Sequence, residues 1–305
     1  MKRTFVRIIM AGVALSFLSC VSAQQKKLLS DSVPQFTGNF SPVSVPIQPA
    51  FRPVQIKQSC SVSAYVQPYG RDEVFLEVGI TGKCKISQLG DSLLWVWDVS
   101  EFKMGSTTLR DDVSILQMKM LSDASGRMKE FDVSSPAVES GRLVLKESKQ
   151  TYKDWLEAAR KEIMGYSTYT YTLPDNPVRT GDVFFKLPLT EILQSNLQSA
   201  NITEPVKDLL RKWDTESPVQ FILRGKTYFD GREALFVSCD SKWHYPTTPS
   251  ADSFHFSISG YELIDMETCQ VLFGEVLLNF SVESQQKAVK GGNYRILMTS
   301  SGKIL

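Results

Sequence analysis

Two histidines, His244 and His255, are the only imidazoles in the chain, and they bracket a loop rich in proline and serine. If this loop joins neighbouring strands, the two rings face each other. Asp240 and Asp252 lie nearby in the sequence, and imidazole and carboxylate groups are the usual metal ligands and acid–base partners. His244 and His255 are therefore candidates for a metal or acid–base site, and a pair of surface histidines is the commoner alternative.

Cysteines offer a second kind of chemistry. In an exported protein, the even set Cys60, Cys84, Cys239 and Cys269 predicts two disulfides, and its wide spacing excludes a CxxC redox or zinc site. Pairing of sequence neighbours and crossed pairing are both open. The register expected for the first hairpin places Cys60 opposite Ile80, four residues or about 13 Å short of Cys84, so that bond requires a bulge or bend.

Catalytic and cofactor motifs are absent. Residues 257–260 lack the first glycine of a Gly-x-Ser-x-Gly elbow, and residues 225–227 imitate the end of a phosphate-binding loop in a segment typical of a strand. The sequence therefore predicts no enzyme, catalytic residue, cofactor or established metal site. Carboxylate pairs for polysaccharide cleavage are spaced in three dimensions, so a carboxylate-dependent hydrolase of envelope polysaccharide stays an alternative.

Aromatic side chains and charge bound the possible ligands. Trp95, Trp97, Tyr169 and Tyr171 could stack on a sugar or an acyl chain, although packing in the core of a large sheet is the commoner explanation. The chain carries 34 Lys and Arg against 33 Asp and Glu, with no basic cluster. A nucleic-acid partner is excluded, because phosphate recognition requires such a cluster.

Residues 1–23 have the anatomy of a secretory signal peptide. Lys2, Arg3 and Arg7 precede an apolar run at 8–18, which is too short to span a bilayer, and small residues at 21–23 suit a signal peptidase. We therefore expect export to the periplasm or cell envelope, with no transmembrane segment in the mature chain.

A second processing route overlaps the first. Residues 17–20, Phe-Leu-Ser-Cys, resemble a lipobox in which Cys20 is acylated and becomes the new N-terminus. Phenylalanine at the first position and leucine at the second depart from the usual pattern. Release as a soluble protein and lipid anchoring through Cys20 both remain open.

The remaining chain divides into a spacer and one domain. Residues 24–57 are rich in proline and predict an extended linker, whereas 58–305 predict a single β-rich domain. Within it we expect helices at about 150–166, 190–200 and 203–213, a tight turn at Asp230-Gly231 and a bulge or sharp bend at Gly260. Period-two alternation predicts strands at 59–67, 73–81, 93–99, 113–121, 126–133, 142–145, 167–173, 183–187, 219–228, 233–243, 254–264, 271–282 and 294–300.

About a dozen antiparallel strands with three grouped helices favour an α+β fold that is mainly antiparallel β. A flat sheet of this width is unusual, so we expect one strongly curved sheet or half-barrel with about three helices on its concave side. No internal repeat suggests a propeller or solenoid.

Two segments, 173–182 and 260–272, resemble uncharacterised secreted bacterial families with a curved antiparallel half-barrel, an architecture also used by periplasmic lipoprotein carriers. Cys269-Gln270 stands where these families have a Thr-Gly turn end. The resemblance implies a fold and an envelope location and carries over no catalytic residue. A curved sheet backed by amphipathic helices tends to leave an apolar cleft of ligand size, so we expect binding of a lipid or other apolar ligand in the half-barrel. The alternative is a structural module with a filled core that binds another envelope protein.

Overall fold

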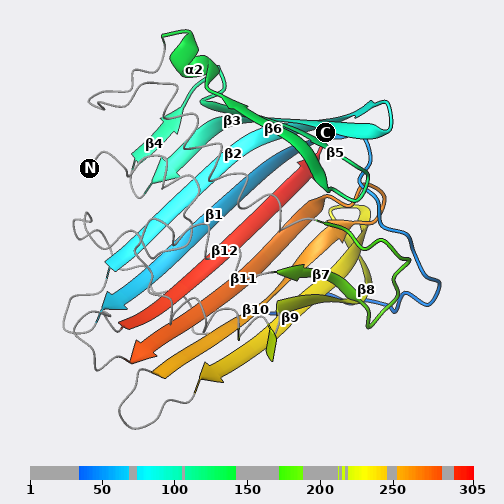
Figure 1. Cartoon of the computed structure of the whole chain (residues 1–305), viewed down its shortest axis with the longest axis vertical. Helices are drawn as coiled ribbons and strands as arrows, with labels where there is room; N and C mark the ends of the chain where they lie inside the picture. The colour runs from blue at the N-terminus through cyan, green and yellow to red at the C-terminus, as the bar shows by residue number, and fades with distance from the viewer. Residues whose placement is uncertain are drawn as a thin grey trace.

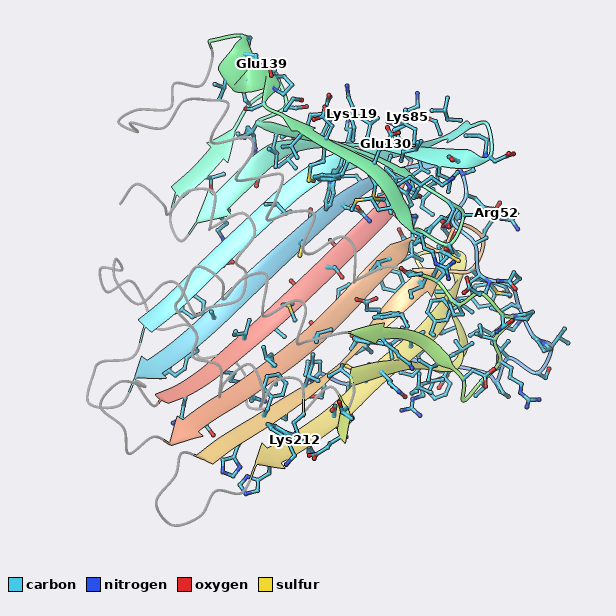
Figure 2. All side chains as sticks on the ribbon, viewed as in Figure 1. Arg52, Lys85, Lys119, Glu130, Glu139 and Lys212 are labelled. Atoms are coloured by element: carbon cyan, nitrogen blue, oxygen red, sulfur yellow. The ribbon has the colours of Figure 1, made fainter. Side chains whose placement is uncertain are left out.

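Twelve antiparallel strands form a single open sheet that curls at both ends (Figure 1). This computed structural model describes residues 34–68, 74–104, 107–141, 172–187, 212, 215–216, 219–245, 253–283 and 292–305. The strands lie in the order β6-β5-β3-β2-β1-β12-β11-β10-β9-β8-β7, and β4 pairs with β3. Their bounds are β1 Val54–Pro68, β2 Val74–Leu89, β3 Ser92–Met104, β4 Thr107–Arg110, β5 Leu116–Ser122, β6 Met128–Ser134, β7 Val183–Leu187, β8 Val219–Phe229, β9 Arg232–Tyr245, β10 Ser253–Asp265, β11 Val271–Glu283 and β12 Gly292–Ile304.

The curved antiparallel sheet agrees with the sequence, but the α+β class with about three helices is wrong. The residues that the structure describes are 66% strand and 4% helix, and none of them forms a helix of seven or more residues. Helix α2 spans only Pro136–Glu139. Apart from Lys212, the predicted helices at 150–166, 190–200 and 203–213 lie outside the described residues. Where the cover of the sheet is described, it consists of irregular chain.

Two local features of the sequence determine the hairpins: the residues at the turns and the alternation of apolar and polar residues along the strands. Asp230 and Gly231 join β8 to β9 with φ angles of 48° and 78°, the positive values that a tight primed turn requires. In the first hairpin, Cys60 lies opposite Ile80, which is the register expected from the alternation of apolar residues. Side-chain parity along a strand therefore fixes which residues face the core.

Residues 34–57 differ from the linker predicted there, because they pack against the sheet. Ile47 and Val178 exchange backbone hydrogen bonds of 2.9 and 2.8 Å. The side chains of Val43 and Phe51 belong to the main core, and each residue is 6% exposed. Prolines have no N–H group to donate, so this segment cannot form the continuous backbone hydrogen bonds of a strand. Isolated β-bridges and buried side chains attach it to the sheet instead.

The core is divided between the two faces of the sheet. We call the concave face, which carries Ile258 and Ile264 of β10, the inner face, and the opposite one, which carries Tyr261 and Leu263, the outer face. The main cluster covers the inner face and joins β1–β3 to β7–β12. On the outer face, Phe36 packs against Tyr261 with ring centroids 5.7 Å apart. Strand β10 is consequently buried on both sides.

Burial on both faces corrects the prediction of a bulge at Gly260. The register is regular at Gly260 and shifts between Leu263 and Ile264 instead. The apparent change of phase arises because Ile258 is buried on the inner face and Tyr261 on the outer face. A local pattern cannot distinguish a bulge from a strand that is covered on both sides.

Candidate functional site

A row of polar side chains crosses the inner face at the middle of the sheet. Glu262 of β10 lies opposite Gly274 of β11, Gly274 lies opposite Ser300 of β12, and Ser300 lies opposite Cys60 of β1. Directly opposed residues of antiparallel strands point to the same face. We call Glu262, Gly274, Ser300 and Cys60 the polar row.

Gly274 leaves room in the centre of this row. A Cβ atom at Gly274 would lie 2.8 Å from the hydroxyl of Ser300 and 3.0 Å from Cγ of Glu262. The Glu262 and Ser300 side chains therefore approach each other over the glycine from its two sides. The Glu262 side chain and the Ser300 hydroxyl therefore lie on either side of Gly274, where the backbone carries no side chain.

The carboxyl group of Glu262 is buried, and no hydrogen-bond donor or counterion among the described residues offsets the loss of its hydration. Its Oε2 atom is buried and accepts no hydrogen bond within the part of the chain that the structure describes. Burial raises the pKa of Glu262 to about 7, because the charged form loses its hydration. Near neutral pH the site therefore exchanges a proton easily, which is a frequent property of functional carboxyl groups.

Two thiols flank this carboxyl group, and both stay protonated. Burial, together with the negative charge of Glu262, raises the pKa of Cys60 to about 11. Burial is also the main cause that raises the pKa of Cys239 to about 12, again with a contribution from Glu262. A thiol is a nucleophile or metal ligand only as the thiolate. These two thiols therefore line the site as small, uncharged side chains.

Apolar side chains surround the polar row. In the neighbouring inner-face row, Cys239, Val276 and Met298 occupy β9, β11 and β12. Ile80 of β2 extends the polar row beyond Cys60, and Val237 of β9 closes it beside Glu262. Val237 is fully buried, whereas Met298 and Ile80 are only half-buried. The carboxyl group thus lies at the edge of an accessible apolar strip.

Trp97 adds an unpaired donor to the same face. Its indole N–H is buried and has no hydrogen-bond partner among the described residues, whereas the indole of Trp95 donates to Ser122 at 2.8 Å. A Cβ atom at Gly82 would lie only 2.8 Å from Nε1 of Trp97, so the glycine leaves space for the ring. Both tryptophans pack against the main core. Tyr169 and Tyr171 lie outside the described residues.

The two predicted disulfides are absent, since Cys60, Cys84, Cys239 and Cys269 are all free thiols. Cys84 lies opposite Ile56, four positions along β1 from Cys60. No bulge in the first hairpin brings the two cysteines together. The even count fitted a disulfide framework, but strand register keeps the pairs apart.

We expect alkylation under denaturing conditions without reductant to label all four of these cysteines. In the folded protein, the same reagent at pH 8 should react at least ten times more slowly than with a free thiol, because burial raises the pKa of each one. Intact mass spectrometry counts the labels. Two labels after denaturation would indicate one disulfide and contradict the structure.

The histidine pair lies where β9 ends and β10 begins, next to the loop that joins the two strands. His244 is directly opposite His255, with stacked rings and 3.0 Å between the two Nδ1 atoms. One Nδ1 must donate and the other accept. Asp240 lies four residues along β9, about 13 Å away, and Asp252 lies outside the described residues. Within the described ranges, no group of three potential ligands forms, so a metal site here stays a prediction.

Other sequence features take ordinary structural positions. The serine motif at 257–260 lies within β10, and the loop-like motif at 225–227 lies within β8, so neither precedes a helix. Cys20 lies outside the described residues. In the described part of the chain, no helix is both long enough and apolar enough to cross a membrane.

Comparisons with known proteins give a limited result. No family model and no curated protein matches the chain. Among solved structures, a DUF1329 family protein from Desulfovibrio piger is 11% identical, with a TM-score of 0.19, over 82% of this chain and 85% of its own. DynF, from the dynemicin biosynthesis pathway of Micromonospora chersina, is 8% identical, with a TM-score of 0.21, over 91% and 92%.

A LolA superfamily protein from Nitrosomonas europaea is 7% identical, with a TM-score of 0.15, over 82% of this chain and 86% of its own. Similarity this remote transfers neither a ligand nor a role to the chain.

Sequence reasoning missed Glu262, although a signal was present. Glu262 has the same parity along its strand as Phe256, Ile258 and Ile264, three residues of the main core. A carboxylate at a core position is expensive unless it is paired. Ser300 lies two strands away and Cys60 lies near the other end of the described chain, so only the assembled sheet reveals the cluster.

Proposed function

We propose that the inner face of the sheet binds a single apolar chain, such as that of a lipid, in a protein exported to the cell envelope. The observation that supports this is a dip in burial at the centre of the face. Along β1, Ile56 is fully buried and Ala64 is 2% exposed, whereas Cys60 between them is half-buried. A partly exposed stretch of the inner face that is flanked by buried residues at both ends suits an elongated apolar ligand.

Strand β12 shows the same profile. Ile296 is 4% exposed, and the next inner-face residues, Met298 and Ser300, are half-buried. Methionine adapts its flexible, polarisable side chain to apolar ligands of varied shape. Export and a possible anchor at Cys20 belong to the same proposal and rest on the sequence of residues 1–23.

The geometry favours binding over carboxylate catalysis. Glycoside hydrolysis requires two carboxyl groups that converge on one bond. Burial raises the pKa of Glu262, and no carboxylate among the described residues contributes to that shift. The described inner-face residues therefore provide one acid where that reaction uses two.

A charge placed in the apolar strip should weaken binding. We expect Met298→Lys to weaken the uptake of dodecanol at least tenfold, because an ammonium group would occupy the path of the chain and resist desolvation. The matched control is Ser301→Lys, which adds the same charge on the same strand at an exposed outer-face position and should bind as the wild type does. Isothermal titration calorimetry measures the affinity, and circular dichroism checks the fold.

Met298→Leu keeps the strip apolar and should retain binding within about threefold. Failure of the wild-type protein to take up dodecanol, or equal loss in both lysine variants, would refute binding at the inner face. Native mass spectrometry of protein purified from its own host should further show a co-purified apolar molecule.

A further inference from the structure

We propose that the polar row selects amphiphiles whose polar end is a cationic amine, held by the Glu262 carboxylate with the hydrocarbon chain along Met298 and Val276. This inference rests on the proposed function and names the class of its ligand. Glu262 and Ser300 approach each other over Gly274. An ammonium group placed above Gly274 would meet an oxygen acceptor on either side.

The charges around the polar row favour this head group. Among the described residues, the titratable groups that face Glu262 are the thiols of Cys60 on β1 and Cys239 on β9, and both are neutral near pH 7. Gly274 and Ser300 represent β11 and β12 in the row and carry no charge. No described Lys, Arg or His shares the inner face of these strands beside Glu262, so a carboxylate or phosphate head would meet no counterion.

The buried carboxylate of Glu262 has an unpaired oxygen acceptor, to which an amine could donate a hydrogen bond. Its Oε2 atom is buried without a donor in the described structure. An unpaired buried acceptor costs stability, and a charge-assisted hydrogen bond from an ammonium group recovers that cost on binding. A carboxyl group retained at such a position is therefore better explained by a ligand than by folding.

The apolar part of the ligand has a defined path. Met298 and Val276 are directly opposite each other on β12 and β11, one inner-face row away from Ser300 and Gly274. Two positions along a strand span about 7 Å, so a chain that begins at Glu262 contacts this apolar row within its first few carbons. Head and chain are thus bound by adjacent rows.

Three probes with the same hydrocarbon chain test the head-group preference. Dodecylamine, dodecanol and dodecanoate are titrated below their micellar concentrations at pH 8, where Glu262 is mostly ionised. We expect dodecylamine to bind at least about tenfold more tightly than dodecanol, and dodecanoate more weakly than either. Glu262→Gln should remove the amine preference, whereas Glu275→Gln, which changes an outer-face carboxylate, should keep it.

A proton balance provides a second measurement. A bound ammonium group requires the ionised carboxylate, so at pH 6 binding should release close to one proton per dodecylamine from Glu262, whose pKa is about 7 when free. Calorimetry in two buffers with different ionisation enthalpies counts this proton. Glu262→Gln should release none. The matched control Glu275→Gln, which removes an outer-face carboxylate on the next strand, should release as much as the wild type.

The outcomes separate the two proposals. Binding of dodecanol with no preference for the amine, or an amine preference that survives Glu262→Gln, overturns the head-group inference and leaves apolar binding intact. Tightest binding of dodecanoate does the same. If none of the three probes binds, the proposed function fails with it.

Discussion

Gly260→Ala should lower the free energy of unfolding by about 3 kcal/mol, near the upper end of the usual cost of overpacking. A Cβ atom at Gly260 would lie 2.2 Å from the carbonyl oxygen of Glu275 and 2.6 Å from Cα of Val276. Both contacts are with backbone, so no change of rotamer relieves them. The β10–β11 ladder would have to separate at its middle, directly beside the polar row.

Gly79→Ala is the matched control, since Gly79 is also a strand glycine. Its nearest contacts to an added Cβ lie at 3.7 Å, which is ordinary packing. We expect its free energy of unfolding to stay within about 0.5 kcal/mol of the wild type, because the unfolded chain also loses some freedom. Urea denaturation followed by circular dichroism measures both variants. Equal stability of the two would mean that β10 and β11 do not approach this closely.

Asp265→Ala should lower the free energy of unfolding by about 3 kcal/mol, because it removes a buried carboxylate that accepts hydrogen bonds from the half-buried Arg232 and from Thr268. Asp265 is 1% exposed and accepts a 2.5 Å hydrogen bond from Nε of Arg232. It also accepts hydrogen bonds of 2.8 and 2.7 Å from the backbone N–H and hydroxyl of Thr268. This carboxylate therefore closes the β10–β11 turn and ties it to the start of β9.

The same carboxylate should give this penalty a pH dependence. Burial favours protonation of Asp265, but hydrogen bonds from Arg232 and Thr268 outweigh it and hold the pKa of Asp265 below its usual value. A lowered pKa stabilises the fold fully above the unfolded value of about 3.9, and this contribution is lost as the pH falls through the folded pKa. The difference between wild type and Asp265→Ala should thus be largest near pH 7 and shrink below pH 4.

An exposed ion pair provides the contrast. Asp175 pairs with Arg127 while both side chains are more than half exposed. Asp175→Ala should cost less than about 1 kcal/mol, because water and salt screen such pairs. Thermal unfolding at pH 7 and pH 3.5 compares the variants. A penalty for Asp265→Ala that is small or independent of pH would contradict the buried network.

Much of the sheet could be predicted because its signals are local. Alternation located most of the described strands within a few residues, and Asp230-Gly231 located the β8–β9 turn. Strand β4 was missed, because four residues are too few to show a period. The proline-rich segment was mistaken for a linker, since nothing in its own sequence shows that Val43 and Phe51 enter a core formed by distant strands.

The candidate site was less predictable, and the reason is geometric. Opposite pairing of His244 and His255 followed from a single hairpin loop. Glu262, Ser300 and Cys60 are instead separated by long stretches of sequence and become neighbours only through three successive strand registers. Register across several successive strands is a property of the whole sheet.

The sequence by itself determined the strand pattern, the turn between β8 and β9 and the parity of each side chain, because all three depend on a few adjacent residues. Only the tertiary structure decided that the described cover of the sheet is irregular chain and that the four thiols stay apart. It also decided that one uncompensated carboxyl group lies on the half-buried inner face. These features depend on which distant strands become neighbours, and that choice is made by burial summed over the entire sheet.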